Sequence, residues 1–188
     1  MGTRIALVRH GETAWNAEGR LQGQTDIPLN EAGRAQARAA GERLAGHDGD
    51  WGVLVSSPLG RAVETATLIG TALGLEAVEP VVGLQERHYG EGEGRAVLGM
   101  PRPRIDELLL SAEPEAEVVD RGLAALVGLV REHPDADLVV VAHGTLIRLV
   151  MSALQDAVHP RLENGEIVLT DTCQLENTMV RRNSTPVH

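Results

Sequence analysis

The sequence predicts an α/β fold, a three-layer α/β/α sandwich with a mostly parallel central sheet. Three apolar segments have the character of short buried strands, and helical patterns separate them along the chain. Strands that alternate with helices in this way are typical of a parallel sheet covered on both faces. The length of 188 residues suits one domain over 1–188.

The predicted strands lie at 5–8, 53–55 and 138–142. The third is the most strand-like, because it is continuous and β-branched, as parallel strands buried on both faces are. Two later segments, at about 166–170 and 174–180, are expected to complete the sheet as an edge or a hairpin. The polar tail beyond the last of these, after Val180, is expected to be frayed.

Helices are expected between these strands. Asn30 is a candidate N-cap for a helix over 31–45. Ser57 is a candidate N-cap for a second helix, with Pro58 at its first position, and a later helix begins near Thr145. Helical spacing of apolar residues supports the second helix and a further amphipathic one: Ala62, Ala66, Ile69 and Leu73 in the second, and Val119, Leu123, Leu126, Val127 and Val130 in the other.

The stretch 86–117 breaks this alternation. It is rich in Gly, Pro and charge, with one short helical stretch near 105–110. We interpret it as a short cap segment over the active site, not as a second domain.

Composition and charge exclude several classes of function. The net charge of −10 argues against a nucleic-acid partner, which usually demands a basic surface. It does not exclude an anionic substrate, because screening beyond about 8 Å lets a local cluster of arginines dominate a pocket. All 17 basic residues are Arg, so every cation can form a bidentate fork to a phosphate.

The sequence predicts a cytoplasmic protein without membrane contact. It has no signal-like stretch, and no apolar run approaches the ~18 residues of a membrane span. The single cysteine, Cys173, cannot form an internal disulfide and fits a reducing compartment.

Polar residues follow the predicted strand ends in four segments, where ligands gather in open α/β sheets. They are Arg9-His10-Gly11, Ser57 to Arg61, Glu86-Arg87 and His143-Gly144. Together they offer two imidazoles, at least two guanidiniums and a carboxyl. Phosphoryl transfer through a covalent intermediate needs this set: an imidazole to attack phosphorus, cations to hold the oxygens, and an acid for the leaving group.

The stretch LVRHGETAWN (7–16) resembles the RHG signature of the histidine phosphatase superfamily, which includes cofactor-dependent phosphoglycerate mutases. Four further blocks agree in order and spacing: RLQGQTDIPLNEAG (20–33), SSPLGRAVETA (56–66), LQERHYGEGEG (84–94) and VVVAHGTLIR (139–148). RHG alone is a weak signal, but five ordered blocks over nearly the whole chain are specific. The resemblance implies an α/β sandwich and a mechanism that needs neither a metal nor a redox cofactor.

The resemblance also implies a role for each matching residue. His10 corresponds to the phospho-accepting nucleophile, and His143 to the second histidine, whose ring hydrogen-bonds the phosphoryl group. Glu86 corresponds to the proton donor for the leaving oxygen. The other matches are phosphate ligands or substrate-facing positions: Arg9, Arg61 and Asn16 as phosphate ligands, and Thr13, Gln22, Gly23, Arg87, Tyr89 and Gly144 facing the substrate.

Simpler interpretations apply to several of these residue types. An arginine such as Arg61 in a first helical turn opposes the helix dipole, a conflict that a bound phosphate removes. Loop carboxylates such as Glu86 are usually only solvated, but its neighbours match the motif as well. No HExxH or CxxC motif occurs, so no metal site is expected. The remaining histidines are interpreted as surface or packing residues: His47, His88, His133, His159 and His188.

We expect a phosphatase that acts on a small phosphorylated metabolite, with a phosphoglycerate mutase as the alternative. The string ERHYG (86–90) resembles the mutase form of its block. The family's mutases carry a long basic insertion before the second histidine, whereas this chain has only 91–114, with Arg95, Arg102 and Arg104 as a partial clamp. A short, open cap admits water, which favours hydrolysis.

Departures from the family pattern leave the substrate open. GEGEG (90–94) lacks the aromatic residue of many short members, and SAEPEAEVVD (111–120) replaces a Gly-Gly-Glu-Ser element. Sugar phosphates, phosphoglycerate derivatives and a nucleotide phosphate of the cobamide pathway all fit, and a homodimer stays open. A non-catalytic module that binds a phosphorylated partner is disfavoured, because a binder has no use for a nucleophile and an acid.

A bell-shaped pH–rate profile is expected. His10 must be neutral to attack, whereas Glu86 must first be protonated and then act as base for the water. Glu86→Gln is therefore expected to slow esters with poor leaving groups most.

Overall fold

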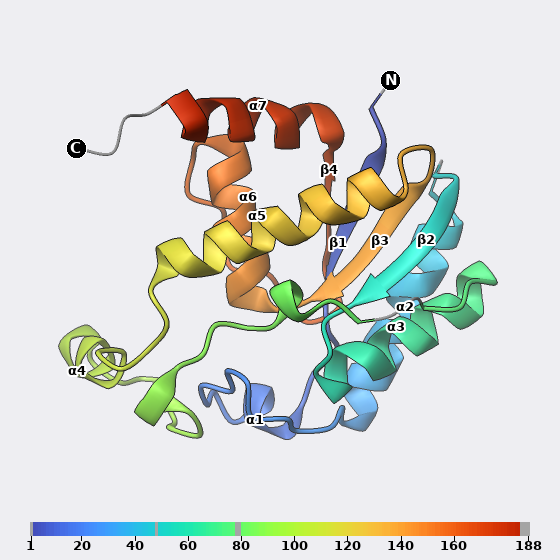
Figure 1. Ribbon diagram of the computed structural model, residues 1–188. Coiled ribbons are helices and arrows are strands. Elements are labelled where there is room, and N and C mark those ends of the chain that lie inside the picture. Colours follow the sequence, from blue (N-terminus) through green and yellow to red (C-terminus); the bar gives the residue numbers. More distant parts are fainter. Residues whose placement is uncertain (1, 48, 78–79, 185–188) are drawn as a thin grey trace.

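The central sheet has the strand order β2-β3-β1-β4 in the computed structural model, which describes residues 2–47, 49–77 and 80–184 (Figure 1). In this part of the chain β1 (Arg4–Arg9), β2 (Trp51–Ser56) and β3 (Asp137–Ala142) run parallel. β4 (Ile167–Asp171) pairs antiparallel with β1 at one edge. The prediction of a mostly parallel sheet is confirmed, with each of the first three strands slightly longer than its apolar segment.

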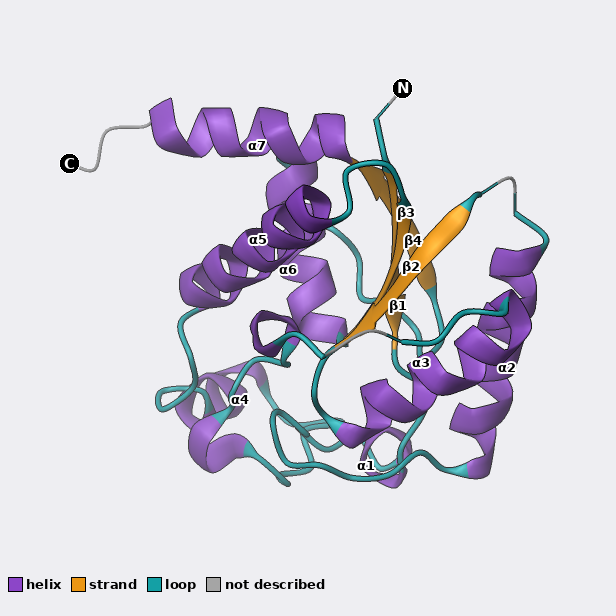
Figure 2. Cartoon of the chain, turned by 45° about the vertical axis from the view of Figure 1, so that its right-hand side comes forward, coloured by secondary structure: helices purple, strands orange, loops and turns teal. Residues whose placement is uncertain are grey.

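Helices cover both faces of the sheet (Figure 2). α2 (Glu31–Ala45) and α3 (Gly60–Leu73) pack on one face. α5 (Glu115–Glu132) and α6 (Gly144–Gln155) pack on the other, where α7 (Thr172–Ser184) joins them. Alternate strand residues divide between the two cores: Ile5, Leu7, Val53, Val55, Leu138 and Val140 with α5 and α6, and Ala6, Val8, Leu54, Val139 and Val141 with α2 and α3. The three-layer sandwich is confirmed.

The predicted apolar positions of the helices lie in these cores. Asn30 caps α2 as expected, because its Oδ1 accepts from the backbone N–H of Gly33 at 2.8 Å. Ala62, Ala66 and Ile69 of α3 are fully buried. Of the apolar positions predicted for α5, Val119, Leu123 and Leu126 are buried, while Val127 and Val130 are partly buried against the same core.

The second late strand, expected at 174–180, is wrong, because this segment forms α7. The Oδ1 atom of Asp171 accepts from the backbone N–H of Gln174 at 2.8 Å, a helix-start bond that turns the chain away from the sheet. Leu175 and Met179 then pack on the α5 and α6 side at helical spacing. The helix continues through Ser184, so fraying after Val180 is also wrong for the described residues. Residues 185–188, and with them His188, lie outside the described residues.

Ser57 is not the N-cap of α3, which is a second correction. The helix begins at Gly60, with Leu59 in the N-cap position. The backbone N–H of Ser57 donates to the Val141 carbonyl at 2.9 Å, which prolongs the ladder between β2 and β3. The chain must turn away from the sheet before it can wind into a helix, and this frees the Ser57 hydroxyl for the site described below.

The segment between α3 and α5 contains η1 (Val82–Leu84), η2 (Gly90–Gly92) and α4 (Arg102–Leu108). The helical stretch predicted near 105–110 is α4, which begins three residues earlier and ends at Leu108. Figure 1 places α4 and the short helix α1 (Ala14–Ala17) beyond the carboxyl ends of the parallel strands. No helix in the described part of the chain is long and apolar enough to cross a membrane.

Candidate active site

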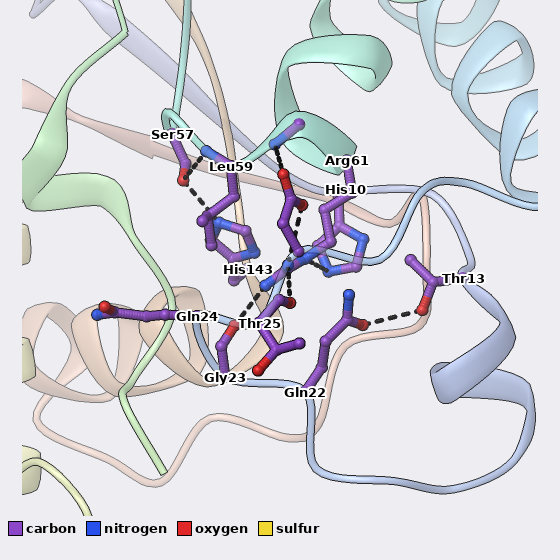
Figure 3. A network of polar contacts seen from close by, with 12 residues as sticks. His10, Thr13, Gln22, Gly23, Gln24, Thr25, Ser57, Leu59, Arg61 and His143 are labelled. Carbon is purple, nitrogen blue, oxygen red and sulfur yellow. Dashed lines mark hydrogen bonds and ion pairs between the residues drawn. The ribbon is translucent and has the colours of Figure 1, made fainter. Parts of the chain in front are cut away.

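His10 and His143 lie side by side because they follow neighbouring parallel strands. In the ladder between β1 and β3, Arg9 pairs with Ala142, so the next residue of each strand emerges at the same edge of the sheet. The backbone N–H of His10 donates to the Ala142 carbonyl at 3.0 Å. The two ring centroids are 5.1 Å apart and the rings are tilted by 59° (Figure 3). The structure therefore brings together the segments Arg9-His10-Gly11 and His143-Gly144, as predicted.

The bonds of the His10 ring define its proton positions. Its Nδ1 lies 2.7 Å from the Gly11 carbonyl oxygen, which can only accept, so Nδ1 carries a proton. Its Nε2 accepts from the Nε of Arg61 at 3.3 Å and so presents a lone pair. Burial lowers the pKa of His10 well below 6.5, and the charges of Arg61 and Arg9 lower it further. The ring is thus held neutral, with the lone pair on Nε2.

His143 is held by Ser57, the residue expected to cap α3. The Nε2 of His143 lies 2.8 Å from the Ser57 hydroxyl, which itself accepts from the backbone N–H of Leu59 at 3.3 Å. In the tautomer in which the hydroxyl donates to Nε2, the ring proton of His143 lies on Nδ1. Burial lowers the pKa of His143 well below 6.5, as do the charges of Arg61, His10 and Arg9.

The guanidinium of Arg61 is fully buried and joins the histidines to the 22–26 loop. It donates from Nη2 to the Gly23 carbonyl at 2.6 Å and from Nη1 to the Thr25 carbonyl at 2.9 Å. Asp26 provides a partial counter-charge at 3.5 Å. Burial lowers the pKa of Arg61, while Glu86 and Asp26 raise it. Figure 3 shows how these bonds link the loop to His10.

Three buried side-chain atoms in the described part of the chain have no hydrogen-bond partner, and all three belong to this site. They are the Nε of Arg9, the Nε2 of Gln22 and the Nδ1 of His143. The first two are donors, and the third is a donor in the tautomer in which Nε2 accepts from Ser57. Unpaired buried donors are costly, and Arg9 and Gln22 line the same cavity as His10, so their free donors indicate a place for an anion.

Neighbouring residues hold these donors in place. The Nη1 of Arg9 donates to the Leu162 carbonyl at 2.6 Å, which leaves Nε free, and burial lowers the pKa of Arg9. Thr13 caps α1 and donates from Oγ1 to the Oε1 of Gln22 at 2.9 Å, so the amide nitrogen of Gln22 is the free end. Asn16 completes this group: its Oδ1 accepts from the backbone N–H of Thr13, and its side chain lines the cavity.

Glu86 lines the cavity at the N-terminus of α6. Its Oε2 accepts from the backbone N–H of Thr145 at 3.0 Å, and its Oε1 from that of Leu146 at 3.0 Å. A carboxyl in this position interacts favourably with the helix dipole. Gly144, at the same helix start, lies so close to Arg9 that a Cβ there would be 3.1 Å from the arginine Nε. Tyr89 lines the same cavity and bonds the Thr145 hydroxyl, and burial raises its pKa.

Several residues expected at the site do not line the cavity. Arg87 does not line the cavity: its guanidinium donates to the Glu113 carbonyl at 2.7 Å and to Glu115 at 3.0 Å, and so ties the cap to α5. Of the three arginines proposed as a partial clamp only Arg102 lines the cavity. Arg104 pairs with Glu107 in the exposed turn of α4. Thr13 and His143, both expected at the site, are fully buried and do not line the cavity, although each bonds a neighbouring site residue. Among the histidines of the described residues only His10 lines it; His47, His88, His133 and His159 do not.

The loop between α6 and β4 supplies residues that no sequence pattern singles out. Asn164 donates from Nδ2 to the His10 carbonyl at 3.0 Å and to the Oδ1 of Asn16 at 3.2 Å. Leu162 contributes the carbonyl that binds Arg9, and Arg161 lines the cavity. The loop turns at Gly165, whose φ of 73° is a backbone conformation that favours glycine, and β4 begins two residues later.

The cavity around these residues has a volume of about 570 Å³. Such a volume is typical of a site for a small organic molecule. No group of three or more His, Cys, Asp or Glu side chains within the described segments is arranged to hold a metal ion. The chemistry that the geometry offers is nucleophilic attack by His10 on an anionic group held by buried N–H donors.

Comparison with known proteins gives concordant matches. The family model described as histidine phosphatase superfamily (branch 1) matches residues 5–184. A Bacillus subtilis protein described as an uncharacterized phosphatase is 36% identical over 88% of this chain and 84% of its own. A metal-independent phosphoserine phosphatase of Arabidopsis thaliana is 35% identical over 82% of this chain and 70% of its own. A 2,3-bisphosphoglycerate-dependent phosphoglycerate mutase of Gloeobacter violaceus is 35% identical, covering 87% of this chain and 80% of that protein.

Solved structures agree with these matches. A mycobacterial glucosyl-3-phosphoglycerate phosphatase, solved in complex with VO3, superposes with a TM-score of 0.78 at 30% identity. The alignment covers 89% of this chain and 92% of that one.

Proposed function

Because the chain belongs to the histidine phosphatase superfamily, we propose that it is a metal-independent phosphatase that hydrolyses small phosphomonoesters through a phosphohistidine at His10. The observation that carries this proposal is that two unpaired buried donors, the Nε of Arg9 and the Nε2 of Gln22, belong to residues that line the same cavity as His10, whose ring centroid lies 5.1 Å from that of His143. A phosphoryl group bound in this cavity would accept from these donors and face the Nε2 of His10.

In the first step the Nε2 of His10 attacks phosphorus and the bond between phosphorus and the ester oxygen breaks. The Gly11 carbonyl holds the Nδ1 proton, so the ring attacks in the correct tautomer. Arg9, Arg61 and the Nδ1–H of His143 stabilise the charge on the equatorial oxygens. Glu86 gives its proton to the leaving oxygen, which departs as the alcohol.

In the second step water hydrolyses the phosphohistidine. Glu86, now a carboxylate, takes a proton from water, whose oxygen attacks phosphorus as the bond to Nε2 breaks. Inorganic phosphate leaves, and both His10 and Glu86 return to their starting states. The exposed flank of the cap favours this step, because Leu98 is 83% exposed although it lines the cavity and leaves a path for water.

A mutase is the second candidate, and the Gloeobacter violaceus relative and the ERHYG string favour it. A mutase must keep water from the phosphohistidine. The cap contributes a single arginine to the cavity wall, Arg102, whose side chain is 81% exposed. This openness supports hydrolysis over transfer.

The test measures phosphate release from a panel of phosphomonoesters in EDTA, with 3-phosphoglycerate supplied with and without 2,3-bisphosphoglycerate. We expect release from several esters, a trapped ³²P label on His10, and loss of both in His10→Ala. Appearance of 2-phosphoglycerate only when the bisphosphate is present would instead identify a mutase. Absence of label and of turnover on every ester would identify a binding module.

A further inference from the structure

We propose that Arg148 and Arg161 form a second anion site in the same cavity, so that the preferred esters carry a second acidic group on the leaving portion. The inference rests on the proposed function, since it concerns the substrate of that same site. The ligand chemistry is an anionic group, either a carboxylate or a second phosphate, joined to the phosphomonoester by a short carbon skeleton.

The cavity is far more basic than the protein around it. Within the described residues six arginines line it, Arg9, Arg20, Arg61, Arg102, Arg148 and Arg161, against the single carboxyl of Glu86. The whole chain, in contrast, has a net charge of −10. Arg9 and Arg61 are assigned to the reacting phosphate, which leaves the charge of the other arginines to be explained.

Two of these other arginines form ion pairs with carboxylates of the protein itself. Arg20 pairs with Glu18 at 2.5 Å, and Arg102 pairs with Asp106 at 2.7 Å one helical turn away. Such exposed pairs need no further anion. Arg148 and Arg161, in contrast, have no such close ion pair among the described residues.

Arg161 has neither a hydrogen bond nor an ion pair within the part of the chain that the structure describes. It stands beside Leu162, whose carbonyl binds the buried arginine at the end of β1. The positive charge of Arg161 also affects Arg9. Burial lowers the pKa of Arg9, Glu86 raises it, and Arg161 lowers it. Arg161 is exposed at the cavity wall, so its guanidinium is accessible to an anionic group of a ligand in the cavity.

Arg148 lies one turn along α6 from Gly144 and therefore on the same face as the Glu86 anchor at Thr145. Its ion-pair partner in the described residues is Glu115, at the long distance of 3.7 Å. Glu115 is shared, because it also accepts from Arg87 at 3.0 Å. The charge of Arg148 is thus only partly neutralised, and Arg148 lines the same cavity as Arg161.

Space is available between the two anion sites. The cavity of about 570 Å³ is much larger than a phosphate group, and apolar residues form part of its wall, namely Leu21, Val97, Leu98 and Ile105. A carbon skeleton can pack on this wall while its two ends bind arginines. Bidentate guanidinium recognition suits both carboxylate and phosphate.

The experiment compares esters that differ only at the second group. 3-Phosphoglycerate is set against glycerol 3-phosphate, and fructose 1,6-bisphosphate against fructose 6-phosphate, using the full chain. We expect kcat/KM to favour the doubly acidic member of at least one pair by about tenfold or more, mainly through KM. The first pair identifies a carboxylate and the second a phosphate.

Variants then locate the site. Arg148→Gln and Arg161→Gln are each expected to reduce this selectivity ratio by about tenfold. Arg38→Gln, which removes an exposed arginine of α2 outside the cavity, keeps the ratio and serves as the matched control. Ratios near one in the wild-type protein, or an unchanged ratio in both cavity variants, would overturn the inference. That outcome is distinct from failure of the proposed function, in which no ester is hydrolysed and His10 takes no label.

Discussion

The Nε of Arg61 donates to the Nε2 of His10 across 3.3 Å, so the side chain that orients the His10 ring also places a positive charge against it. Burial is the largest cause that lowers the pKa of His10, and Arg61 is the next. The same contact therefore keeps the ring neutral and its lone pair aligned. This relationship leads to the first prediction.

We expect the His10 ring to titrate well below pH 6.5 in the folded protein, as followed by the NMR shift of its C2 proton. Arg61→Gln removes the adjacent charge and should raise the pKa toward the ordinary value, whereas Arg38→Gln should leave it unchanged. A midpoint close to 6.5 in the wild-type protein would contradict the neutral nucleophile.

Stability should fall as the pH drops below about 6.5, because His10 and His143 are both buried with lowered pKa values. Between 6.5 and the folded pKa values, the unfolded chain binds protons that the folded chain does not. Each histidine then costs up to about 1.4 kcal/mol of unfolding free energy per pH unit. Above pH 6.5 both contributions are fully present.

Urea unfolding at pH 7.5 and pH 5.5 measures this effect. His143→Gln removes one of the two titrating groups, so its stability should change less between the two pH values than that of the wild-type protein. Equal changes in the two proteins would show that His143 does not carry the effect.

Much of this architecture follows from local sequence patterns. The apolar run 138–142, the Asn30 cap and the helical spacing from Ala62 to Leu73 each predict the element that forms. The proximity of His10 and His143 is also predictable, because both follow parallel strands, although adjacency of β1 and β3 in the sheet is a tertiary property. Local sequence patterns are sufficient to predict an element where the burial pattern and the intrinsic propensity of its residues agree.

Other features depend on contacts between distant segments. Ser57 has a helix-cap sequence, but its backbone stays in the sheet ladder and its hydroxyl binds His143, 86 positions away. Asp171 provides a helix-start signal that the strand-like pattern of 174–180 masked. Asn164 and Arg161 enter the site from a loop without periodicity, so only the folded chain reveals their positions.

Inorganic phosphate should stabilise the protein by satisfying the unpaired donors of the site. Saturation at 100 times the dissociation constant corresponds to about 2.7 kcal/mol, which is detectable as a rise in Tm. Gln22→Met removes one unpaired donor, so we expect a smaller phosphate-induced shift. An equal shift in Gln22→Met and wild type would show that Gln22 does not contact the anion.

Gly23→Ala tests whether the backbone of the 22–26 loop must hold Arg61. Gly23 has φ of 57°, and a Cβ there would lie 2.1 Å from the Oε1 of Glu93. Burial raises the pKa of Glu93, but bonds from Thr25 and from backbone N–H groups outweigh it and lower the pKa, so this carboxylate is firmly anchored. We expect a loss of about 1–3 kcal/mol in the free energy of unfolding.

Gly128→Ala is the matched control, because Gly128 is exposed within α5 and a Cβ there would meet nothing within 4 Å. It should gain about 0.5–1 kcal/mol, since alanine favours a helix interior more than glycine does. Gly23→Ala should also reduce kcat/KM, because displacement of the Gly23 carbonyl releases the Arg61 Nη2 bond of 2.6 Å. If Gly23→Ala kept full stability but lost activity, the glycine would matter only for substrate access, and the loop would not be what positions Arg61.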